Sequence, residues 1–277
     1  MPAPPVSALH AQRLSLVHAG GRVAIDALEL AVQPGERVAI IGPSGAGKTS
    51  LLRVFATAQR QSAGRLAVLG ADPWALGGRA RRRLRRRLGL IHQAPPLPPR
   101  QRVVTAVLAG RLGRWSLARS LASLAYPADI DGARAALGRV EMADRLFDRC
   151  DRLSGGQAQR VGIARVLYQG PEVILADEPV SALDPALANR TVGLLVEEAR
   201  ARRVTLVASL HAVDLALAHF PRLVGLRDGR VQFDLPRPDV NDGLLRALYA
   251  QEGFLPTQHG KPFALPEVRL PEAPRCG

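Results

Sequence analysis

The sequence predicts an α/β fold built around a parallel β-sheet, and three observations support this prediction. Two continuous apolar runs, Val173 to Ala176 and Val204 to Leu210, are typical of parallel strands covered on both faces. A helical stretch from Pro185 to Arg202 separates them, which gives the strand, helix, strand order of a crossover unit. A further buried strand is expected at Arg37 to Ile41, directly before a glycine-rich loop and an apolar helix.

Different patterns flank these strands. The segment from residue 8 to residue 36 mixes β-branched residues with glycine and proline turns, which predicts a small antiparallel sheet. From residue 95 to residue 170 the pattern is helical and rich in Ala, Leu and Arg, which predicts an inserted helical subdomain. An Asp-Gly turn in LVGLRDGRVQF predicts a hairpin. We expect a core domain from residues 8–94 and 171–235, the helical subdomain at 95–170, and a peripheral C-terminal extension at 236–277.

The size and composition are those of an ordinary globular protein. With 277 residues and 47% hydrophobic composition, the chain can bury a substantial core. Its apolar runs fall far short of the roughly 20 residues that cross a bilayer. The first residues show no secretory signal, and Cys150 and Cys276 are the only cysteines. We therefore expect a chain that spans no membrane and stays in the cytoplasm.

The positive charge is almost entirely arginine. The formal net charge is +14, and Lys48 and Lys261 are the only lysines. Such a charge usually favours nucleic acid or an anionic membrane surface, but coding bias in a GC-rich genome produces the same excess without any selection for binding. The densest part, residues 79–89, has apolar residues at a spacing of four and predicts a basic amphipathic helix. Its basic face is either solvated or lies near lipid headgroups.

A phosphate-binding loop is predicted between the first core strand and its helix. The sequence GPSGAGKT fits G-x-x-x-x-G-K-[ST], in the strand and helix context that the mechanism requires. Glycines let backbone amides turn toward phosphate oxygens, and the helix N-terminus adds partial positive charge. Lys48 is expected to reach the β- and γ-phosphates of ATP, and Thr49 to ligate Mg²⁺. The predicted nucleotide-binding residues are Gly42, Pro43, Ser44, Gly45, Ala46, Gly47, Lys48, Thr49 and Ser50.

Two adjacent acids follow the apolar strand VILADE. Asp177 at the end of the strand is expected to hold the Mg²⁺ shell, and Glu178 to polarise the attacking water. Acids after a strand also simply begin loops. The functional interpretation depends on the phosphate loop upstream.

The segment LSGGQ, Leu153 to Gln157, separates this chain from other phosphate-loop proteins. At a helix start it offers a hydroxyl group and unobstructed amides to an anion, although a plain helix cap has the same composition. Together with the two motifs above, it resembles the ATP-binding cassette family over about residues 8–235. The resemblance implies a head-to-tail homodimer in which each subunit caps the γ-phosphate of the other's ATP. The capping residues would be Ser154, Gly155, Gly156 and Gln157.

The same resemblance assigns three further residues, each of which has an ordinary structural alternative. Gln93 in GLIHQ matches the glutamine that senses Mg²⁺ and water and whose loop faces the transmembrane partner. Asp184 in SALD matches a loop that crosses the dimer interface, and it is also a plausible helix cap. His211 in SLHAVD matches the histidine that contacts the γ-phosphate. The resemblance thus implies catalytic roles for Lys48, Gln93, Glu178 and His211, and Mg²⁺ contacts for Thr49, Gln93 and Asp177.

Two positions depart from the family pattern. Where the family usually has an aromatic residue that stacks on adenine, this chain offers His18, whose imidazole stacks over less area. After Gln93 the chain reads APPLPPR in place of the more usual phenylalanine-containing segment. Adenine affinity and the surface offered to the transmembrane partner are therefore expected to differ.

A single cassette without long insertions resembles the ATPase subunit of a bacterial importer. GRLGRW, ARVLYQGPEVILADEPVSALDP and SLHAVDLALAHFPRLVGLRDGRVQFDLP look most like the ATPase of phosphonate importers. This implies two permease subunits, a periplasmic or lipid-anchored substrate-binding protein, and a peripheral position at the cytoplasmic face of the inner membrane.

Three other functions stay open on the sequence. The ATPases of importers for phosphite, phosphate esters or other small solutes are similar to this chain in much of the same sequence. A soluble cassette ATPase associated with nucleic acid belongs to another class, although no nucleic acid is expected as a partner. A monomeric phosphate-loop kinase would use the same loop without the LSGGQ segment.

Overall fold

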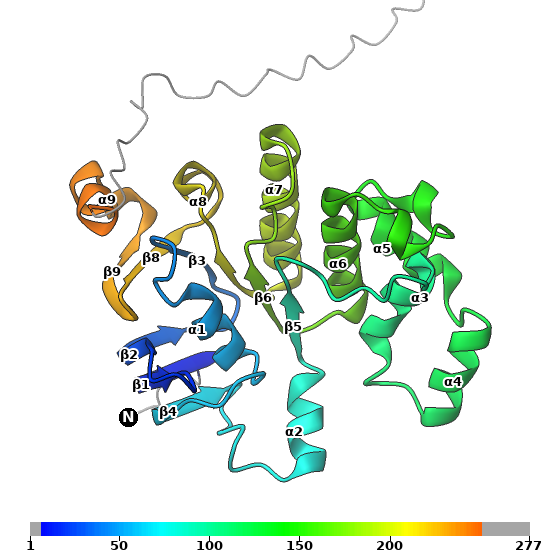
Figure 1. Ribbon diagram of the computed structural model, residues 1–277, viewed down its shortest axis with the longest axis horizontal. Coiled ribbons are helices and arrows are strands. Elements are labelled where there is room, and N and C mark those ends of the chain that lie inside the picture. The colour runs from blue at the N-terminus through cyan, green and yellow to red at the C-terminus, as the bar shows by residue number, and fades with distance from the viewer. Residues whose placement is uncertain (1–6, 251–277) are drawn as a thin grey trace, which may run out of the picture.

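The computed structural model describes residues 7–250, without the side chains of residues 124 and 125. Within these residues the chain forms a six-stranded sheet and a separate three-stranded sheet (Figure 1). The six-stranded sheet has the order β5 (Leu88–Ile91), β6 (Val173–Asp177), β7 (Thr205–Ser209), β3 (Arg37–Ile41), β8 (Arg222–Arg227) and β9 (Arg230–Pro236). Its strands pair in parallel except for the antiparallel hairpin of β8 and β9. The predicted α/β fold with a parallel-sheet core is confirmed.

The central strands of this sheet are buried on both faces, which explains their continuous apolar sequences. Every residue of β6 and β7 is buried. Ser209 at the end of β7 pairs with Asp177 of β6 and with Ile40 of β3. The carboxyl ends of three neighbouring strands therefore meet at one edge of the sheet, where open α/β sheets bind ligands.

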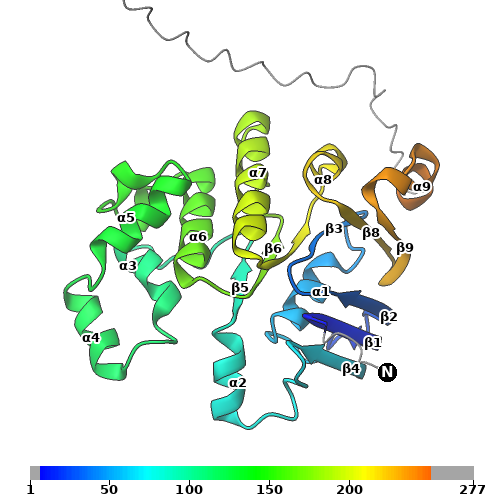
Figure 2. The same ribbon diagram turned by 180° about the vertical axis from the view of Figure 1, so that it is seen from behind.

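The small sheet is antiparallel, with the order β2 (Val23–Val32), β1 (Leu9–Val17) and β4 (Ala63–Val68). Helix α1 (Lys48–Phe55) lies between it and the main sheet (Figures 1 and 2). The side chains of Leu51, Leu52 and Phe55 are fully buried in a core that both sheets share. This packing fixes the start of α1, and with it the loop that precedes the helix.

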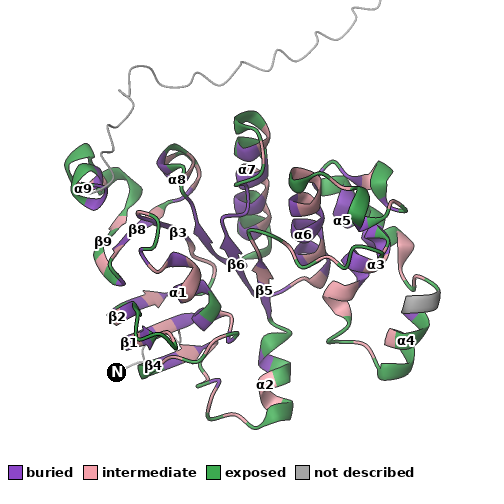
Figure 3. Cartoon of the chain, in the orientation of Figure 1, coloured by how far each residue is buried: buried purple, intermediate pink, exposed green. Residues whose placement is uncertain are grey.

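Helices cover the other face and extend beyond the β5 edge. The covering helices are α7 (Pro185–Arg202) and α8 (Val213–His219); the helices between β5 and β6 are α3 (Val103–Leu108), α4 (Leu117–Ala125), α5 (Ile130–Arg139) and α6 (Gly155–Gln169). Except in α4, where Leu117 and Leu121 are exposed, the buried sides of these helices face one another and the sheet (Figure 3) and join the strands in one hydrophobic core. The division of the chain into core, helical subdomain and C-terminal extension stays a proposal.

The predicted basic helix is shorter than expected. Helix α2 (Gly78–Arg85) ends before Leu88, which is the first residue of β5 and pairs with Val173. The prediction of a helix through residue 89 is therefore wrong, because Leu88 and Gly89 pair in parallel with β6 and do not form the last helical turn. Leu84 is buried, whereas Arg82, Arg83 and Arg86 are exposed.

The beginning of the predicted C-terminal extension is not peripheral. Helix α9 (Asp242–Leu248) buries Leu245 and Leu248, and the next residue, Tyr249, is also buried. Residues 1–6 and 251–277, which include Cys276 and the rest of the predicted extension, lie outside the described residues. Of the helices within residues 7–250, none has the length and apolar character that a bilayer crossing requires.

Candidate functional site

The predicted phosphate loop joins β3 to α1, and its first residue must be glycine. Gly42 has φ +150°, and a Cβ atom placed on it would lie 1.9 Å from the Leu226 carbonyl oxygen in β8. At the other end of the loop, Gly47 has φ +102° and is the N-cap of α1. The loop therefore curls tightly between a strand and a helix N-terminus, the local structure that binds phosphate groups.

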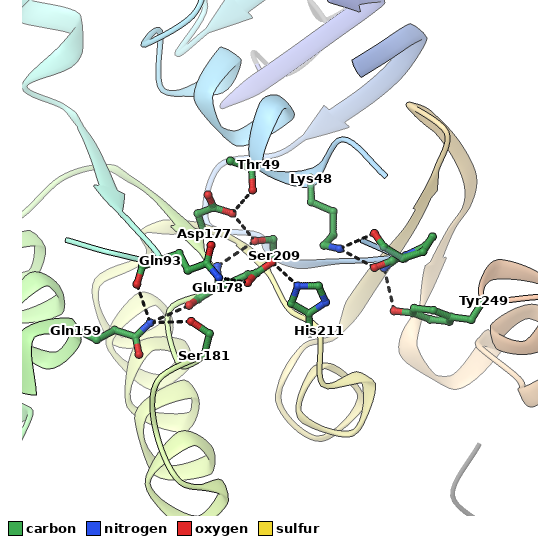
Figure 4. A network of polar contacts seen from close by, with 12 residues as sticks. Lys48, Thr49, Gln93, Gln159, Asp177, Glu178, Ser181, Ser209, His211 and Tyr249 are labelled. Atoms are coloured by element: carbon green, nitrogen blue, oxygen red, sulfur yellow. Dashed lines mark hydrogen bonds and ion pairs between the residues drawn. The ribbon is translucent and has the colours of Figure 1, made fainter. Parts of the chain in front are cut away.

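Lys48 lies over this loop, as Figure 4 shows. Its side chain is 5% exposed, and Nζ donates hydrogen bonds to the carbonyl oxygens of Gly42 at 2.6 Å and Pro43 at 3.0 Å. These carbonyl groups hold the ammonium group beside the loop amides. A phosphate oxygen can compete with them for the same protons, because an ionised acceptor binds an ammonium group more strongly than a neutral carbonyl group does.

Asp177 and Thr49 form the second part of the site. The Asp177 carboxylate at the end of β6 accepts hydrogen bonds from the Thr49 hydroxyl group at 2.9 Å and the Ser209 hydroxyl group at 3.0 Å. Hydroxyl and carboxylate oxygens are ligands that suit Mg²⁺, so the pair fits the predicted metal role. Sequence reasoning missed Ser209. The available signal was a hydroxyl group at the end of the apolar run VTLVASL.

Glu178 follows in a backbone conformation that few residues adopt. Its φ is +46°, a left-handed value that costs energy in a residue other than glycine and is concentrated at functional sites. Its amide donates to the Ser209 hydroxyl group at 3.0 Å. One carboxylate oxygen accepts a hydrogen bond from Gln93 Nε2 at 2.8 Å, and the other lies 2.5 Å from His211 Nε2. Three predicted catalytic side chains thus converge (Figure 4).

One cavity of about 360 Å³ collects most of the predicted residues. Loop residues 44–50 line it together with Gln93, Glu178 and His211. Gly42, Pro43 and Asp177 do not line the cavity, but they form hydrogen bonds with residues that do: Gly42 and Pro43 with Lys48, and Asp177 with Thr49. The site therefore has donors for a polyphosphate on one side and a carboxylate suited to activating water on the other.

His18 lines the same cavity. Its imidazole Nε2 lies 3.4 Å from the Ser50 hydroxyl group, and its Nδ1 lies 3.5 Å from Gln59 Nε2. Arg22 lines the cavity too and was not among the sequence predictions. Its signal was its place directly after the Gly20-Gly21 turn that follows His18.

The LSGGQ residues and Asp184 do not line this cavity. Ser154 and Gln157 form a reciprocal cap at the start of α6. The Ser154 hydroxyl group accepts a hydrogen bond from the Gln157 backbone amide at 3.3 Å, and the Gln157 side-chain Oε1 accepts one from the Ser154 backbone amide at 2.9 Å. Gly155 is exposed beside them, and Gly156 is half-buried. The Asp184 carboxylate caps α7 by accepting from the Leu187 amide at 3.0 Å. At the tip of α6, Ser154 and Gly155 are thus exposed, and the first amides of a helix have no acceptor within the helix.

Gln159, which sequence reasoning missed, connects helix α6 to two segments of the site, the one at Gln93 and the loop at residues 178–182. Its side chain is 1% exposed, and Nε2 donates to the Glu178 carbonyl oxygen at 2.9 Å. The same nitrogen lies 3.3 Å from the Gln93 carbonyl oxygen and 3.4 Å from the Ser181 hydroxyl group, and Gln159 Oε1 accepts from the Ala182 amide at 3.1 Å. An uncharged polar residue inside the apolar helix AQRVGIARVLY was the available signal.

Tyr249 also contacts the phosphate loop, although the sequence placed it in a peripheral extension. Its hydroxyl group accepts a hydrogen bond from the Gly42 amide at 3.0 Å (Figure 4). Arg227 Nη1 donates to the Ala247 carbonyl oxygen at 2.8 Å and holds the end of α9 against β8. Lys48 and Tyr249 therefore bind the carbonyl and amide groups of the same glycine.

Comparison with known proteins identifies similar sequences over most of this chain. A family model described as ABC transporter matches residues 25–181. The chain is 62% identical over 263 residues to "Phosphonates import ATP-binding protein PhnC 2" of Pseudomonas aeruginosa (strain UCBPP-PA14), covering 95% of this chain and 97% of that protein. It is 63% identical over 246 residues to "Phosphonates import ATP-binding protein PhnC 1" of Cupriavidus necator, covering 89% of this chain and 88% of that protein.

Solved structures with similar folds are cassettes as well. A bacterial ABC transporter cassette determined as a dimer superposes with a TM-score of 0.74 at 25% identity, covering 83% of this chain and 98% of that chain. A post-hydrolysis dimer of such a cassette, bound to ADP and Pi, superposes with a TM-score of 0.72 at 24% identity, with coverage of 83% and 98%.

Proposed function

Because the chain belongs to the ABC transporter family of ATP-binding proteins, we propose that it is the ATP-hydrolysing subunit of an importer for phosphonates. One observation supports this most directly: Glu178 meets Gln93 and His211 at the cavity that the phosphate loop lines. ATP is the substrate of this site. Phosphonate is proposed from the names of relatives that are about 60% identical over nearly the whole chain.

The residues divide the chemistry between them. The loop amides and Lys48 bind the phosphates, and Glu178 accepts a proton from the attacking water while Gln93 and His211 orient its carboxylate. Thr49 and Asp177 would hold Mg²⁺ with Gln93 nearby, and the bound ion would offset phosphate charge. His18 and Arg22 also line the cavity, and we assign to them the binding of the nucleoside part of ATP.

A second copy of the chain completes each site. The tip of α6 is assigned to the γ-phosphate bound by the other copy, with Asp184 at the interface; its residues are Ser154, Gly155, Gly156 and Gln157. The dimeric cassettes with a similar fold support this arrangement. Two permease subunits and a substrate-binding protein, periplasmic or lipid-anchored, complete the transporter. The chain then lies peripherally at the cytoplasmic face of the inner membrane.

Uptake of radiolabelled phosphonate tests this function in a strain that lacks the gene. Wild-type chain restores uptake, and Lys48→Ala does not, because the phosphate loop loses its cation. Competition with unlabelled phosphite and phosphate esters identifies the substrate among related anions. Restored uptake of one of those anions without phosphonate would replace the substrate. ATPase stimulation by DNA or RNA at physiological salt, with no uptake of any of these anions, would overturn the importer function.

A further inference from the structure

Glu178 is held from two directions by different parts of the fold. On the sheet side its amide donates to the hydroxyl and carbonyl oxygens of Ser209. On the helix side its carbonyl oxygen accepts from Gln159 Nε2 at 2.9 Å. The residue between these anchors has φ +46°, so its conformation persists only if its surroundings hold it there.

Gln159 is suited to this task because it is buried and nearly fixed. Its side chain is 1% exposed, and its oxygen is occupied by the Ala182 amide at 3.1 Å, which sets which way the amide nitrogen points. That nitrogen also lies within 3.3 Å of the Gln93 carbonyl oxygen. One side chain therefore fixes the backbone on both sides of the hydrogen bond between Gln93 and the Glu178 carboxylate.

The packing of α6 brings Gln159 to this place. One turn along the same face, a Cβ atom on Gly162 would lie 2.8 Å from Cβ of Pro95, so the helix and the segment after Gln93 are in close contact. Longer side chains at this position would separate the helix from that segment. Gln159 and Gly162 together form one rigid junction between α6 and the catalytic edge of the sheet.

We propose that Gln159 is a positioning residue for ATP hydrolysis: it holds the Glu178 and Gln93 backbones so that the Glu178 carboxylate faces the attacking water. The proposal rests on the proposed function of Glu178. Without the Gln159 amide, Glu178 relaxes from its left-handed conformation and its carboxylate turns away from Gln93. ATP binding does not depend on this contact, because the phosphate loop is held by other groups.

The test is Gln159→Met in the purified full-length chain, with Gln169→Met as the matched control. Gln169 lies on the same helix, and its amide donates to the backbone carbonyl oxygens of Leu88 at 2.7 Å and Arg86 at 3.3 Å, away from Glu178. Both variants lose an amide that binds backbone, so both lower Tm. Only Gln159→Met lowers kcat, by about 10- to 100-fold, with ATP Kd within about twofold of wild type.

Equal kcat values for the two Met variants would overturn the proposal. If Gln159→Met does not fold, Gln159→Asn takes its place, since it keeps an uncharged amide but is one methylene group too short to accept from Ala182 and donate to Glu178 together. Its kcat must fall in the same way, and a wild-type kcat would contradict the proposal. A wild-type chain that neither binds nor hydrolyses ATP would instead refute the proposed function, so the two failures are distinguishable.

Discussion

The sheet side and the helix side of the candidate site are built differently. On the sheet side, backbone ladders between β3, β6 and β7 place Asp177 and Ser209 opposite each other, and loop atoms meet β8 backbone directly at Gly42. On the helix side, side chains make the connection, through Gln159 to Glu178 and through Gly162 against Pro95. A ladder cannot shift without breaking several hydrogen bonds, whereas side-chain contacts adjust singly. The helix side is therefore where small changes should alter turnover without removing nucleotide binding.

A glycine-to-alanine substitution can be made on either side, and we expect the larger effect on the sheet side. Gly42→Ala puts a Cβ atom 1.9 Å from the Leu226 carbonyl oxygen at φ +150°, so the loop must leave its place. We expect ATP affinity to fall by about 100-fold or more in isothermal titration calorimetry. Gly20→Ala, where a Cβ atom meets nothing within 4 Å, serves as the control and should bind normally. Wild-type affinity in Gly42→Ala would show that the loop is not rigid.

On the helix side, Gly162→Ala should lower turnover and spare binding. Its Cβ atom presses Pro95 away from α6, and the Gln93 segment moves with it. We expect kcat to fall by about 10-fold at an unchanged Kd for ATP, measured by steady-state ATPase assays. In α5, Gly138→Ala meets nothing within 4 Å and should be neutral for turnover and slightly stabilising. Equal kcat values in the two variants would refute a coupled junction.

Tyr249→Phe sharpens the difference by removing one hydroxyl group from the sheet side. The buried Gly42 amide loses its acceptor, which costs about 1–3 kcal/mol. We expect ATP Kd to rise about fivefold with little change in kcat. The matched control, Tyr168→Phe, removes the hydroxyl group that donates to Asp129 at 2.8 Å in the helical region. It should lower Tm without changing Kd. Equal Kd values in all three proteins would show that α9 does not support the loop.

The smallest expected effect is on the pH dependence of stability, and it comes from Asp129 and Tyr168 in the helical region. The Tyr168 hydroxyl group lowers the pKa of Asp129, while burial, followed by this hydrogen bond, raises the pKa of Tyr168 to about 12. Because the folded pKa of Asp129 is depressed, its stabilisation is present above its ordinary pKa and is lost as pH falls through the folded value. Asp129→Asn should lose about 1 kcal/mol or less at pH 7, with the difference from wild type shrinking toward pH 3 in urea unfolding. A difference that grows toward pH 3 would contradict this.

Residues within sequence motifs were predictable, and residues that act between motifs were not. The apolar runs and GPSGAGKT located β3, β6, β7 and the loop because local pattern and local structure coincide there. The Asp-Gly turn likewise located the hairpin of β8 and β9. Gln159 and Tyr249 act across 19 and 207 residues of sequence, respectively, so only the folded chain reveals their partners.

The wrong sequence predictions have the same origin. The pattern of residues 79–89 continues a helix through Leu88, but pairing with Val173 is worth more than another exposed helical turn. The tail around residues 244–249 has a short period and prolines before it, which resembles a loose extension. Leu245, Leu248 and Tyr249 are nevertheless buried, because in the fold they join the hydrophobic core that includes Leu223 of β8 and Phe233 of β9.

The most direct test of the central claim is ATP hydrolysis by Glu178→Gln. The variant keeps the size and the hydrogen-bond acceptor that Gln93 uses, but it is a far weaker base. We predict that it binds ATP with wild-type affinity, accumulates as an ATP-bound dimer, and hydrolyses ATP about 100-fold or more slowly than wild type. Hydrolysis at the wild-type rate in the assembled transporter, or in a chain that stays monomeric with ATP bound, would contradict the account.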